Sequence, residues 1–269
     1  EEIARIHGYD AIPARLPTGE IRLAAPSETR VETGVFRRQL AAHDYLETIN
    51  YAFVDAGLLK TWQLDAGVVA LANPLSSELG AMRTSLLPGL VDALRRNRAR
   101  QNRRIRLFEC GRTFATGNPP VESQRIAAVA SGSADGEQWA SKARPVDFFD
   151  LKAEVERLFA LAGASAEFRA ADEAFGHPGK SASIWRDGRR VGWIGHLHPR
   201  LLKALDIDED VVAFELEADA ASLRAIPRTG ELSRFPSVRR DLAVVVPEST
   251  AWASLEGSLE AALGTHLAE

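Results

Sequence analysis

The segment from residue 73 to residue 114 constrains the fold of this chain more than any other. It reads NPLSSELGAMRTSLLPGLVDALRRNRARQNRRIRLFECGRTF, a loop, then a helix, then a strand. Apolar residues recur at helical spacing over residues 86–101. The predicted buried residues of this helix are Leu87, Leu90, Val91 and Leu94. On the strand that follows, Arg106 and Glu109 lie three residues apart, so their side chains are predicted to leave opposite faces.

The other predicted elements alternate irregularly between helix and strand. Helices are predicted at residues 28–43, 146–163 and 198–207, and strands at residues 46–54, 68–73, 105–111, 125–132 and 211–219. Residues 181–198 read as a hairpin, because Asp187-Gly188 suits a two-residue turn between alternating strands. A hairpin implies antiparallel pairing. The chain is therefore predicted to be an α+β protein with a mixed, mostly antiparallel sheet flanked by helices.

Composition excludes several classes of protein. The 269 residues are enough for one large domain or two of moderate size. The formal net charge of −4 gives no whole-chain attraction to RNA, so any RNA contact must be local. Cys110 is the single cysteine, which excludes an internal disulfide and a cysteine-based zinc cluster. No apolar run has the length of a membrane span. We therefore expect a cytoplasmic protein with no membrane partner.

Both ends of the sequence are expected to be cut from a longer polypeptide. Glu1 is not Met and falls within a helix-like stretch, EEIARIHG, which is followed by an extended connector with Pro13 and Pro17. The stretch SRFPSVRRDLAVVVPE opens a further unit. In this unit a strand is predicted at residues 242–246 and a helix after Ser249.

The segment at residues 73–114 resembles the ATP-binding region of a class II aminoacyl-tRNA synthetase core. A working core of that class has an Arg and a Glu two residues apart on the strand, so that both reach ATP from one face. Arg106 and Glu109 depart from this spacing. Along essentially the whole chain, the order of elements resembles that of bacterial phenylalanyl-tRNA synthetase β subunits. The matching words are RTSLLPGL, RLFECGRTF, VDFFDLK, HPGKSA, GHLHPRLL, FELE and SRFPSVRRDLAVVV.

The resemblance implies three parts and a set of partners. Residues 1–17 would end a helical domain called B5, residues 18–228 would form a noncatalytic class II synthetase-like core, and residues 229–269 would begin a ferredoxin-like anticodon-binding domain. In the family, two α and two β chains form a phenylalanine–tRNA ligase in which the α subunit uses ATP. The implied partners are the α subunit, expected to dock on residues 28–43 and 48–54, and the phenylalanine tRNA.

The residues themselves also favour an inactive core with no catalytic residue. A class II site needs a glycine-rich turn that aims an Arg at the γ-phosphate of ATP. The matching stretch VVAFELEADAASLR has no glycine. Glu215 and Glu217 would repel phosphate, and Arg224 lacks the turn that would aim it. Because adenylation depends on positioned cations and magnesium, such a site is expected to be inert.

The resemblance assigns two further sites. Glu1 and Glu2 match acidic residues of a magnesium site shared with the α subunit, and carboxylate oxygens suit Mg²⁺. Without the resemblance, the pair reads as a solvated helix start. Arg234, Arg239 and Arg240 fall in the expected anticodon-binding part and are the candidates for binding tRNA.

Other polar features have both a functional and a structural interpretation. Residues 95–106 hold seven arginines, which read as an RNA-facing strip or, with more weight, as a solvated helix face or a subunit contact. His196 and His198 have the spacing of a metal chelate but no visible third ligand, so structural roles are favoured. Cys110 has no recognisable partner that would make it a nucleophile.

Two alternative functions remain open at the level of sequence. One is an active ATP-dependent adenylating enzyme with divergent class II motifs. The other is a free-standing protein-interaction module. ATP–pyrophosphate exchange by the isolated chain separates the first alternative from an inert core, which is expected to show none.

Overall fold

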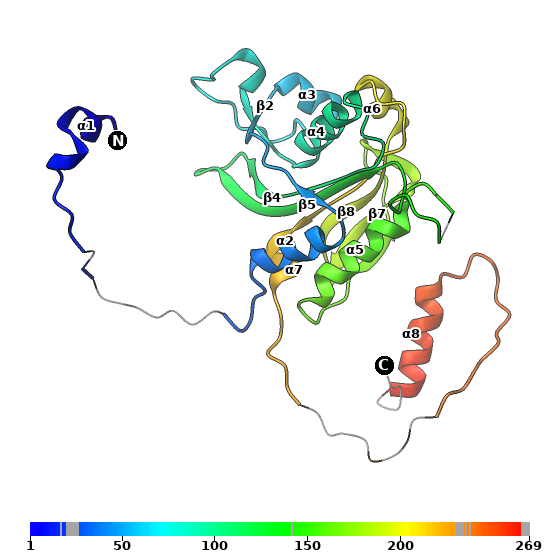
Figure 1. Ribbon diagram of the computed structural model, residues 1–269. Helices are drawn as coiled ribbons and strands as arrows, with labels where there is room; N and C mark the ends of the chain where they lie inside the picture. Colours follow the sequence, from blue (N-terminus) through cyan, green and yellow to red (C-terminus); the bar gives the residue numbers. More distant parts are fainter. Residues whose placement is uncertain are drawn as a thin grey trace. The chain divides into compact units, whose positions relative to one another are not determined.

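The computed structural model describes residues 1–16, 18–19, 27–140, 142–229, 234, 236 and 238–264. The chain divides into two compact units, Glu1–Ile226 and Pro227–Glu269 (Figure 1). The predicted connector through Pro17 and the stretch at residues 233–241 lie partly outside the described residues. The assignment of residues 1–17, 18–228 and 229–269 to named domains stays a prediction.

A seven-stranded sheet forms the centre of the first unit, with strand order β1-β4-β5-β9-β8-β7-β6 (Figure 1). The strands are β1 (Leu46–Glu47), β4 (Ile105–Ala115), β5 (Val121–Ser131), β6 (Glu167–Ala170), β7 (Gly176–Arg186), β8 (Arg189–Leu197) and β9 (Val212–Glu217). β1 runs parallel to β4, and every other neighbouring pair is antiparallel. The predicted α+β class and the mixed, mostly antiparallel sheet are confirmed.

Helices cover both faces of this sheet (Figure 1). The first face packs against α2 (Thr33–Ala42), α5 (Phe148–Ala160) and α7 (Ala218–Ser222), and the second against α4 (Leu87–Ala99), α6 (Pro199–Ala204) and the end of α3 (Ala56–Thr61). Along β5, Ile126 and Ala128 join the first core, whereas Ala127 and Val129 join the second. The part of β5 that is buried on both faces, residues 126–130, is apolar throughout, as expected for such a strand. Among the described residues, no helix combines the length and apolar character needed to span a bilayer.

Local sequence signals explain why the main elements form where they do. In α4, Leu87, Leu90, Val91 and Leu94 are buried as predicted. Each such fully buried side chain contributes about 1.5–3 kcal/mol. In the β7–β8 hairpin, Asp187 has φ 51° and Gly188 has φ 73°, the two positive values that a two-residue turn of this kind requires.

The helix α5 begins with a reciprocal cap. Asp147 accepts hydrogen bonds from the backbone N–H groups of Phe149 and Asp150, at 2.8 and 3.1 Å. The Asp150 carboxylate in turn accepts from the backbone N–H of Asp147 at 2.9 Å. The two carboxylates therefore satisfy backbone donors of the first turn and fix the start of the helix. Gly163, with φ 63°, follows its end as predicted.

Three sequence-based boundaries were wrong or only partly right. The strand predicted at residues 46–54 is two short strands in different sheets, because β1 pairs with β4 whereas β2 (Phe53–Val54) pairs with β3 (Ala81–Met82). Residues 68–73 form no strand and make one isolated bridge, between Ala70 and Ala81, with two backbone hydrogen bonds to the β3 segment, from Leu71 to Gly80 and from Met82 to Val69. The helix predicted at residues 28–43 begins only at Thr33. The short elements η1 (Tyr9–Ala11) and η2 (Ser77–Leu79) were not predicted.

The second unit contains one described helix, α8 (Trp252–Leu263), where a helix after Ser249 was predicted. The strand predicted at residues 242–246 is wrong, since these residues form no strand. A strand needs a neighbour for its backbone N–H and C=O groups, and the described residues of this unit supply none. Val245 is correspondingly fully exposed.

Candidate functional site

Two carboxylates lie on the same sheet face, on β4 and β9, with β5 between them. These strands contain the segments that resemble the ATP-binding part of a class II core. Glu109 of β4 is in register with Ala127 of β5, and Ala127 is in register with Glu215 of β9. All three side chains are on the face covered by α4. Arg106 leaves the opposite face, where its guanidinium stands 5.3 Å from the centre of the Tyr45 ring. The predicted separation of Arg106 from Glu109 is confirmed.

The negative charge of Glu109 is neutralised by Arg83. Arg83 Nη1 donates to Glu109 Oε1 at 2.7 Å, and both side chains are more than nine-tenths buried. Asn50 Nδ2 donates to the other oxygen, Oε2, at 2.7 Å. Arg83 Nε also donates to the carbonyl of Arg112 at 2.8 Å. The carboxylate and the guanidinium are thus held from several sides in a protein interior, where such a pair resists opening.

Gly111 makes room for this ion pair. A Cβ at that position would lie 2.4 Å from Arg83 Nη2 and 3.0 Å from Glu109 Oε1. The first distance is well below any normal contact between a carbon and a nitrogen. Residue 111 is therefore glycine because any larger side chain would collide with the Arg83 guanidinium, and not because the backbone turns there.

Glu215 binds the start of α4. Ser85 Oγ donates to its Oε2 at 2.8 Å, and the backbone N–H of Leu86 donates to its Oε1 at 2.8 Å. The carboxylate thereby satisfies donors at a helix N-terminus, where negative charge is favourable. Burial raises the pKa of Glu215, while the hydrogen bond from Leu86 and the nearby Arg125 oppose that rise. We call Asn50, Arg83, Ser85, Glu109 and Glu215 the closed cluster.

Glu217 and Arg224 also have structural partners. Glu217 forms an ion pair with Arg189 of β8, at 2.6 Å. Arg224 follows α7, and its Nε donates to the carbonyl of Glu28 at 2.6 Å, while its backbone N–H donates to Thr29. Arg224 therefore joins the end of the β9–α7 segment to the residues before α2. It has no glycine turn, and its guanidinium is used in this link.

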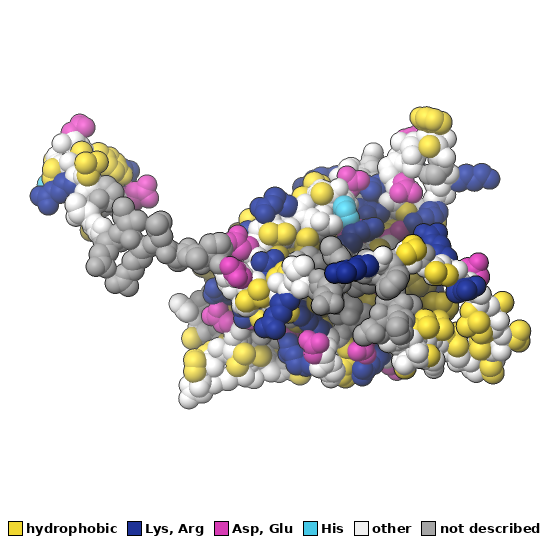
Figure 2. Space-filling model, turned by 90° about the horizontal axis from the view of Figure 1, so that it is seen from below, with side chains coloured by type: hydrophobic (Ala, Val, Ile, Leu, Met, Phe, Trp, Pro, Cys, Tyr) yellow, Lys and Arg dark blue, Asp and Glu magenta, His cyan; other side chains and the backbone are white. Residues whose placement is uncertain are grey.

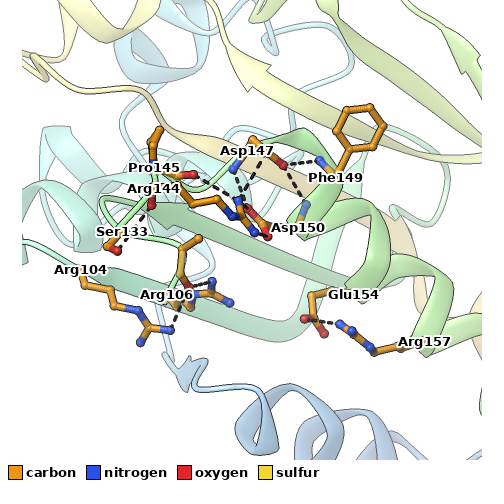
Figure 3. Close-up of polar contacts among 11 residues, drawn as sticks. Arg104, Arg106, Ser133, Arg144, Pro145, Asp147, Phe149, Asp150, Glu154 and Arg157 are labelled. Carbon is orange, nitrogen blue, oxygen red and sulfur yellow. Dashed lines mark hydrogen bonds and ion pairs between the residues drawn. The ribbon is translucent and has the colours of Figure 1, made fainter. Parts of the chain in front are cut away.

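The arginine-rich run at residues 95–106 is largely paired within the chain. Arg95 and Arg96 both bind Asp92, and Arg98 forms an ion pair with Glu209. Arg104 binds Asp44, and both Arg104 and Arg106 donate to the carbonyl of Ala134 (Figure 3). In the part of the chain that the structure describes, Arg100 and Arg103 are the two residues of the run whose guanidinium groups have neither a hydrogen-bond nor an ion-pair partner. Figure 2 shows the opposite side of the sheet, covered by α2, α5 and α7, where basic and acidic side chains are interspersed.

Arg144 lies beside the cap of α5. Its guanidinium makes two contacts with the Asp150 carboxylate, the longer at 2.7 Å, and reaches Asp147 at 3.5 Å (Figure 3). The hydrogen bond from Arg144 lowers the pKa of Asp150. This pair is half exposed on the arginine side, so it strengthens a cap that is already formed.

The histidine pair does not form a chelate. His198 caps α6, since its Nδ1 accepts from the backbone N–H of Arg200 at 3.0 Å. His196 is buried on β8, and its Nδ1 is 3.8 Å from Asp210. Among the described residues no group of three or more potential metal ligands is found. Cys110 is half-buried, and burial raises the pKa of its thiol to about 11, which opposes a nucleophilic role.

The structure describes the residues assigned by resemblance but does not bring them into a site. Glu1 precedes α1 (Glu2–His7), both carboxylates are exposed, and Glu2 forms an ion pair with Arg5. The tRNA-binding candidates are exposed residues of the second unit, Arg234, Arg239 and Arg240. Their roles in magnesium and tRNA binding stay predictions.

Sequence reasoning missed the residues that close the cluster. Asn50, Arg83 and Ser85 were not singled out, although Arg83 and Ser85 belong to the word RTSLLPGL. Asn50 and Arg83 lie 59 and 26 residues from Glu109 along the chain. An Arg and a Ser just before a buried helix were the one available signal.

Comparisons with known proteins agree on one family. The family model described as the phenylalanyl tRNA synthetase beta chain CLM domain matches residues 12–218. The phenylalanine–tRNA ligase beta subunit of Xanthomonas campestris pv. campestris strain 8004 is 56% identical over the whole chain, and that of Xanthomonas axonopodis pv. citri is also 56% identical. The one from Xylella fastidiosa strain Temecula1 is 50% identical over 98% of the chain. The chain spans 34% of the length of each of these relatives. It belongs to the family of the phenylalanyl-tRNA synthetase β-chain CLM domain.

Proposed function

We propose that this chain is a noncatalytic part of the β subunit of a phenylalanine–tRNA ligase. In this role it supports ATP-dependent attachment of phenylalanine to its tRNA by bracing the α subunit and positioning the tRNA, while the α subunit uses ATP. The observation that carries the proposal is the closed cluster. Its guanidinium and both of its carboxylates are engaged in internal hydrogen bonds, so Arg83 is not available to a triphosphate and the two carboxylates would repel one.

The arrangement of the first unit supports a class II synthetase-like core. A short parallel strand, β1, flanks an otherwise antiparallel sheet, and the β4–β5 pair is followed in space by β9 and its helix α7. This is the order of parts in which the resemblance places the ATP-binding strands. In such a core the nucleotide lies on one sheet face. Here the corresponding face carries the closed cluster and α4.

The segment after α2 has the character of a docking surface for the α subunit. β1 lies at the edge of the sheet, so its outer backbone groups are free to meet another chain. Leu46 is 69% exposed, Ile49 94% and Tyr51 75%. Exposed large apolar side chains close together in sequence are typical of protein interfaces. They support the proposed contact through residues 28–43 and 48–54.

Magnesium at Glu1 and Glu2 is compatible with the donor chemistry present. Both carboxylates are exposed hard-oxygen donors, which is the type that Mg²⁺ takes. Glu2 would have to leave Arg5 to bind the ion. Two carboxylates do not complete a six-coordinate site, so the remaining ligands would come from water and from the α subunit. Bound there, the ion would join the two subunits by neutralising facing carboxylates.

Transfer RNA is the second proposed partner, through Arg234, Arg239 and Arg240. Guanidinium groups bind phosphate through paired hydrogen bonds, and these three side chains are exposed. The chain's net charge of −4 means that such a contact has to be local. A cytoplasmic location follows from the proposed role in protein synthesis.

The test is ATP–pyrophosphate exchange with phenylalanine, measured for this chain alone and for the α subunit together with the complete β subunit. We expect no exchange by the chain and full exchange by the complex. Exchange by the chain alone would establish the active adenylating alternative. Failure of the complete β subunit to co-purify with the α subunit would favour the free-standing interaction module.

A further inference from the structure

A cavity of about 540 Å³ is lined by the start of α5, by residues 179–181 of β7, by His196 of β8 and by Asp210, which precedes β9. Its walls include Pro145, Val146, Phe148 and Phe149 on one side, with Lys180 and His196 among the polar residues that line it. This volume is in the range of small-molecule sites, and an apolar wall with a few converging polar groups is their usual composition. The cavity is on the face opposite the closed cluster, since Phe148 packs against the core under α5.

His196 reaches this cavity without a hydrogen-bond partner. The residue is 7% exposed, and its Nδ1 is buried and unpaired, 3.8 Å from the Asp210 carboxylate. In the described part of the chain its Nε2 has no partner either. Burial, followed by the nearby Lys180, lowers the pKa of His196, so the ring is neutral and has one N–H to donate. A buried polar side chain without a partner is costly unless something completes it.

Lys180 is brought to the cavity by an irregularity in β7. The pairing of β7 with β8 shifts register between Gly176 and Ser181, and Gly179 in the shifted stretch has φ 81°. This stretch is the word HPGK of the sequence. Bulges of this kind commonly re-aim a side chain near functional sites. No ion-pair partner of Lys180 is found within the described ranges, in contrast to most arginines of the first unit.

Two acidic residues also lie at the rim. The Asp147 carboxylate caps α5 and faces Arg144, whereas the Asp210 carboxylate is mostly exposed and lies 3.8 Å from His196 Nδ1. The groups that can bind an anion are one ammonium and one imidazole N–H, with an aromatic wall beside them. The Phe149 side chain is 71% exposed and points away from Arg104 and Arg106 (Figure 3).

From this arrangement we infer that the cavity binds a small organic carboxylate with an aromatic or similarly bulky apolar body. The carboxylate would lie against Lys180 and accept from His196, and the apolar body would pack on Phe148 and Phe149. The inference does not depend on the proposed function, because the cavity is remote from the closed cluster and from the edge strand β1.

The experiment measures binding of 3-phenylpropionate to the 269-residue chain by ¹H–¹⁵N NMR, including the imidazole ¹⁵N signals of His196. Phenethylamine and 3-phenylpropan-1-ol serve as probes with the same ring and a positive or neutral head. We expect saturable binding of the carboxylate, with shifts at His196, Lys180 and Phe149. The alcohol is expected to bind several-fold more weakly, and the amine more weakly still.

Two exposed positions provide variants that should fold normally. Lys180→Ala is expected to weaken carboxylate binding about 5-fold, and Phe149→Ala to weaken binding of both carboxylate and alcohol. Lys203→Ala, which removes an exposed lysine that does not line this cavity, is the matched control and should change nothing. The inference is overturned if no saturable shifts occur at His196, if Lys180→Ala and Lys203→Ala behave alike, or if the amine binds as well as the carboxylate.

Discussion

The closed cluster and the cavity beside α5 are two polar regions on opposite faces of one sheet, and they handle charge differently. In the closed cluster each buried charge meets a partner within 2.8 Å, and even a glycine is used to make the space. In the cavity a buried imidazole and a lysine have no such partner. Buried charges that complete each other serve the fold, whereas an unpaired buried imidazole beside an exposed ammonium leaves binding capacity for a ligand. One sheet can thus carry a closed polar cluster on one face and leave room for a ligand on the other.

The largest effect should come from breaking the ion pair of the closed cluster. Arg83→Met leaves the Glu109 carboxylate buried with only Asn50 to bind it. The free energy of unfolding should fall by about 3–5 kcal/mol, measured by urea denaturation followed by circular dichroism.

Arg96→Met is the matched control, because Arg96 is 61% exposed and pairs with Asp92 on the surface. Its effect should stay within about 0.5 kcal/mol. The double variant Arg83→Met with Glu109→Leu should lose less than Arg83→Met alone, since no uncompensated charge remains. Equal losses for Arg83→Met and Arg96→Met would show that the cluster is not closed in solution.

The next effect concerns the space reserved by Gly111. In Gly111→Ala the new methyl group would meet the Arg83 guanidinium at 2.4 Å, so the ion pair must shift. Overpacking of this kind costs about 1–3 kcal/mol, which thermal or urea unfolding will detect. Gly34→Ala in α2 is the control, because its added Cβ meets only the end of Arg38 at 3.5 Å and alanine favours a helix. A neutral Gly111→Ala would mean that Arg83 lies elsewhere.

Much of this architecture follows from local sequence, but the closed cluster does not. The burial of Leu87 and Leu90 follows from helical spacing, and the hairpin turn follows from Asp187-Gly188, because each depends on residues near one another in the chain. The opposite directions of Arg106 and Glu109 follow from strand geometry alone. The partners of Glu215, by contrast, lie about 130 residues away, at the start of α4. Only the register of β4, β5 and β9 brings them together, and β9 pairs with β5 across more than 80 residues of chain.

The same limit explains the segment at residues 46–54. Its apolar residues read as one strand, yet Leu46 pairs in the large sheet and Phe53 in the small one. Between them, Ile49 and Tyr51 are exposed, whereas Asn50 is half-buried and binds Glu109. Propensity indicates an extended chain in both cases, whereas the choice of partner strand is a tertiary property.

A smaller effect should appear in the pH dependence of stability. Burial holds the folded-state pKa of Glu215 above the unfolded value of about 4.3. Its contribution is fully present below that unfolded value, and it is lost as pH rises through the raised folded pKa. In Glu215→Gln this part of the pH dependence should disappear, so that the variant loses less stability than the wild type between about pH 4.3 and neutrality.

Urea denaturation at several pH values measures this difference in stability. Glu122→Gln, which changes an exposed glutamate, tests whether removal of any glutamate has the same effect. Parallel curves for Glu215→Gln and the wild type would contradict the assigned burial.

The smallest expected effect tests whether the arginine run is a surface of the fold or a contact for RNA. Five of its seven guanidinium groups have partners within the chain. The triple variant Arg96→Ala, Arg100→Ala, Arg103→Ala in the complete enzyme should therefore leave the tRNA affinity and its salt dependence unchanged. The pair Arg239→Ala and Arg240→Ala is the comparison, and we expect it to weaken binding and reduce the salt slope, because each lost phosphate contact releases one counterion fewer. Filter binding at 50 and 200 mM salt measures both. If the triple variant lowers the slope and the pair does not, the RNA contact belongs to the α4 side of the sheet, and the proposed division between a bracing core and an RNA-binding second unit has to be reversed.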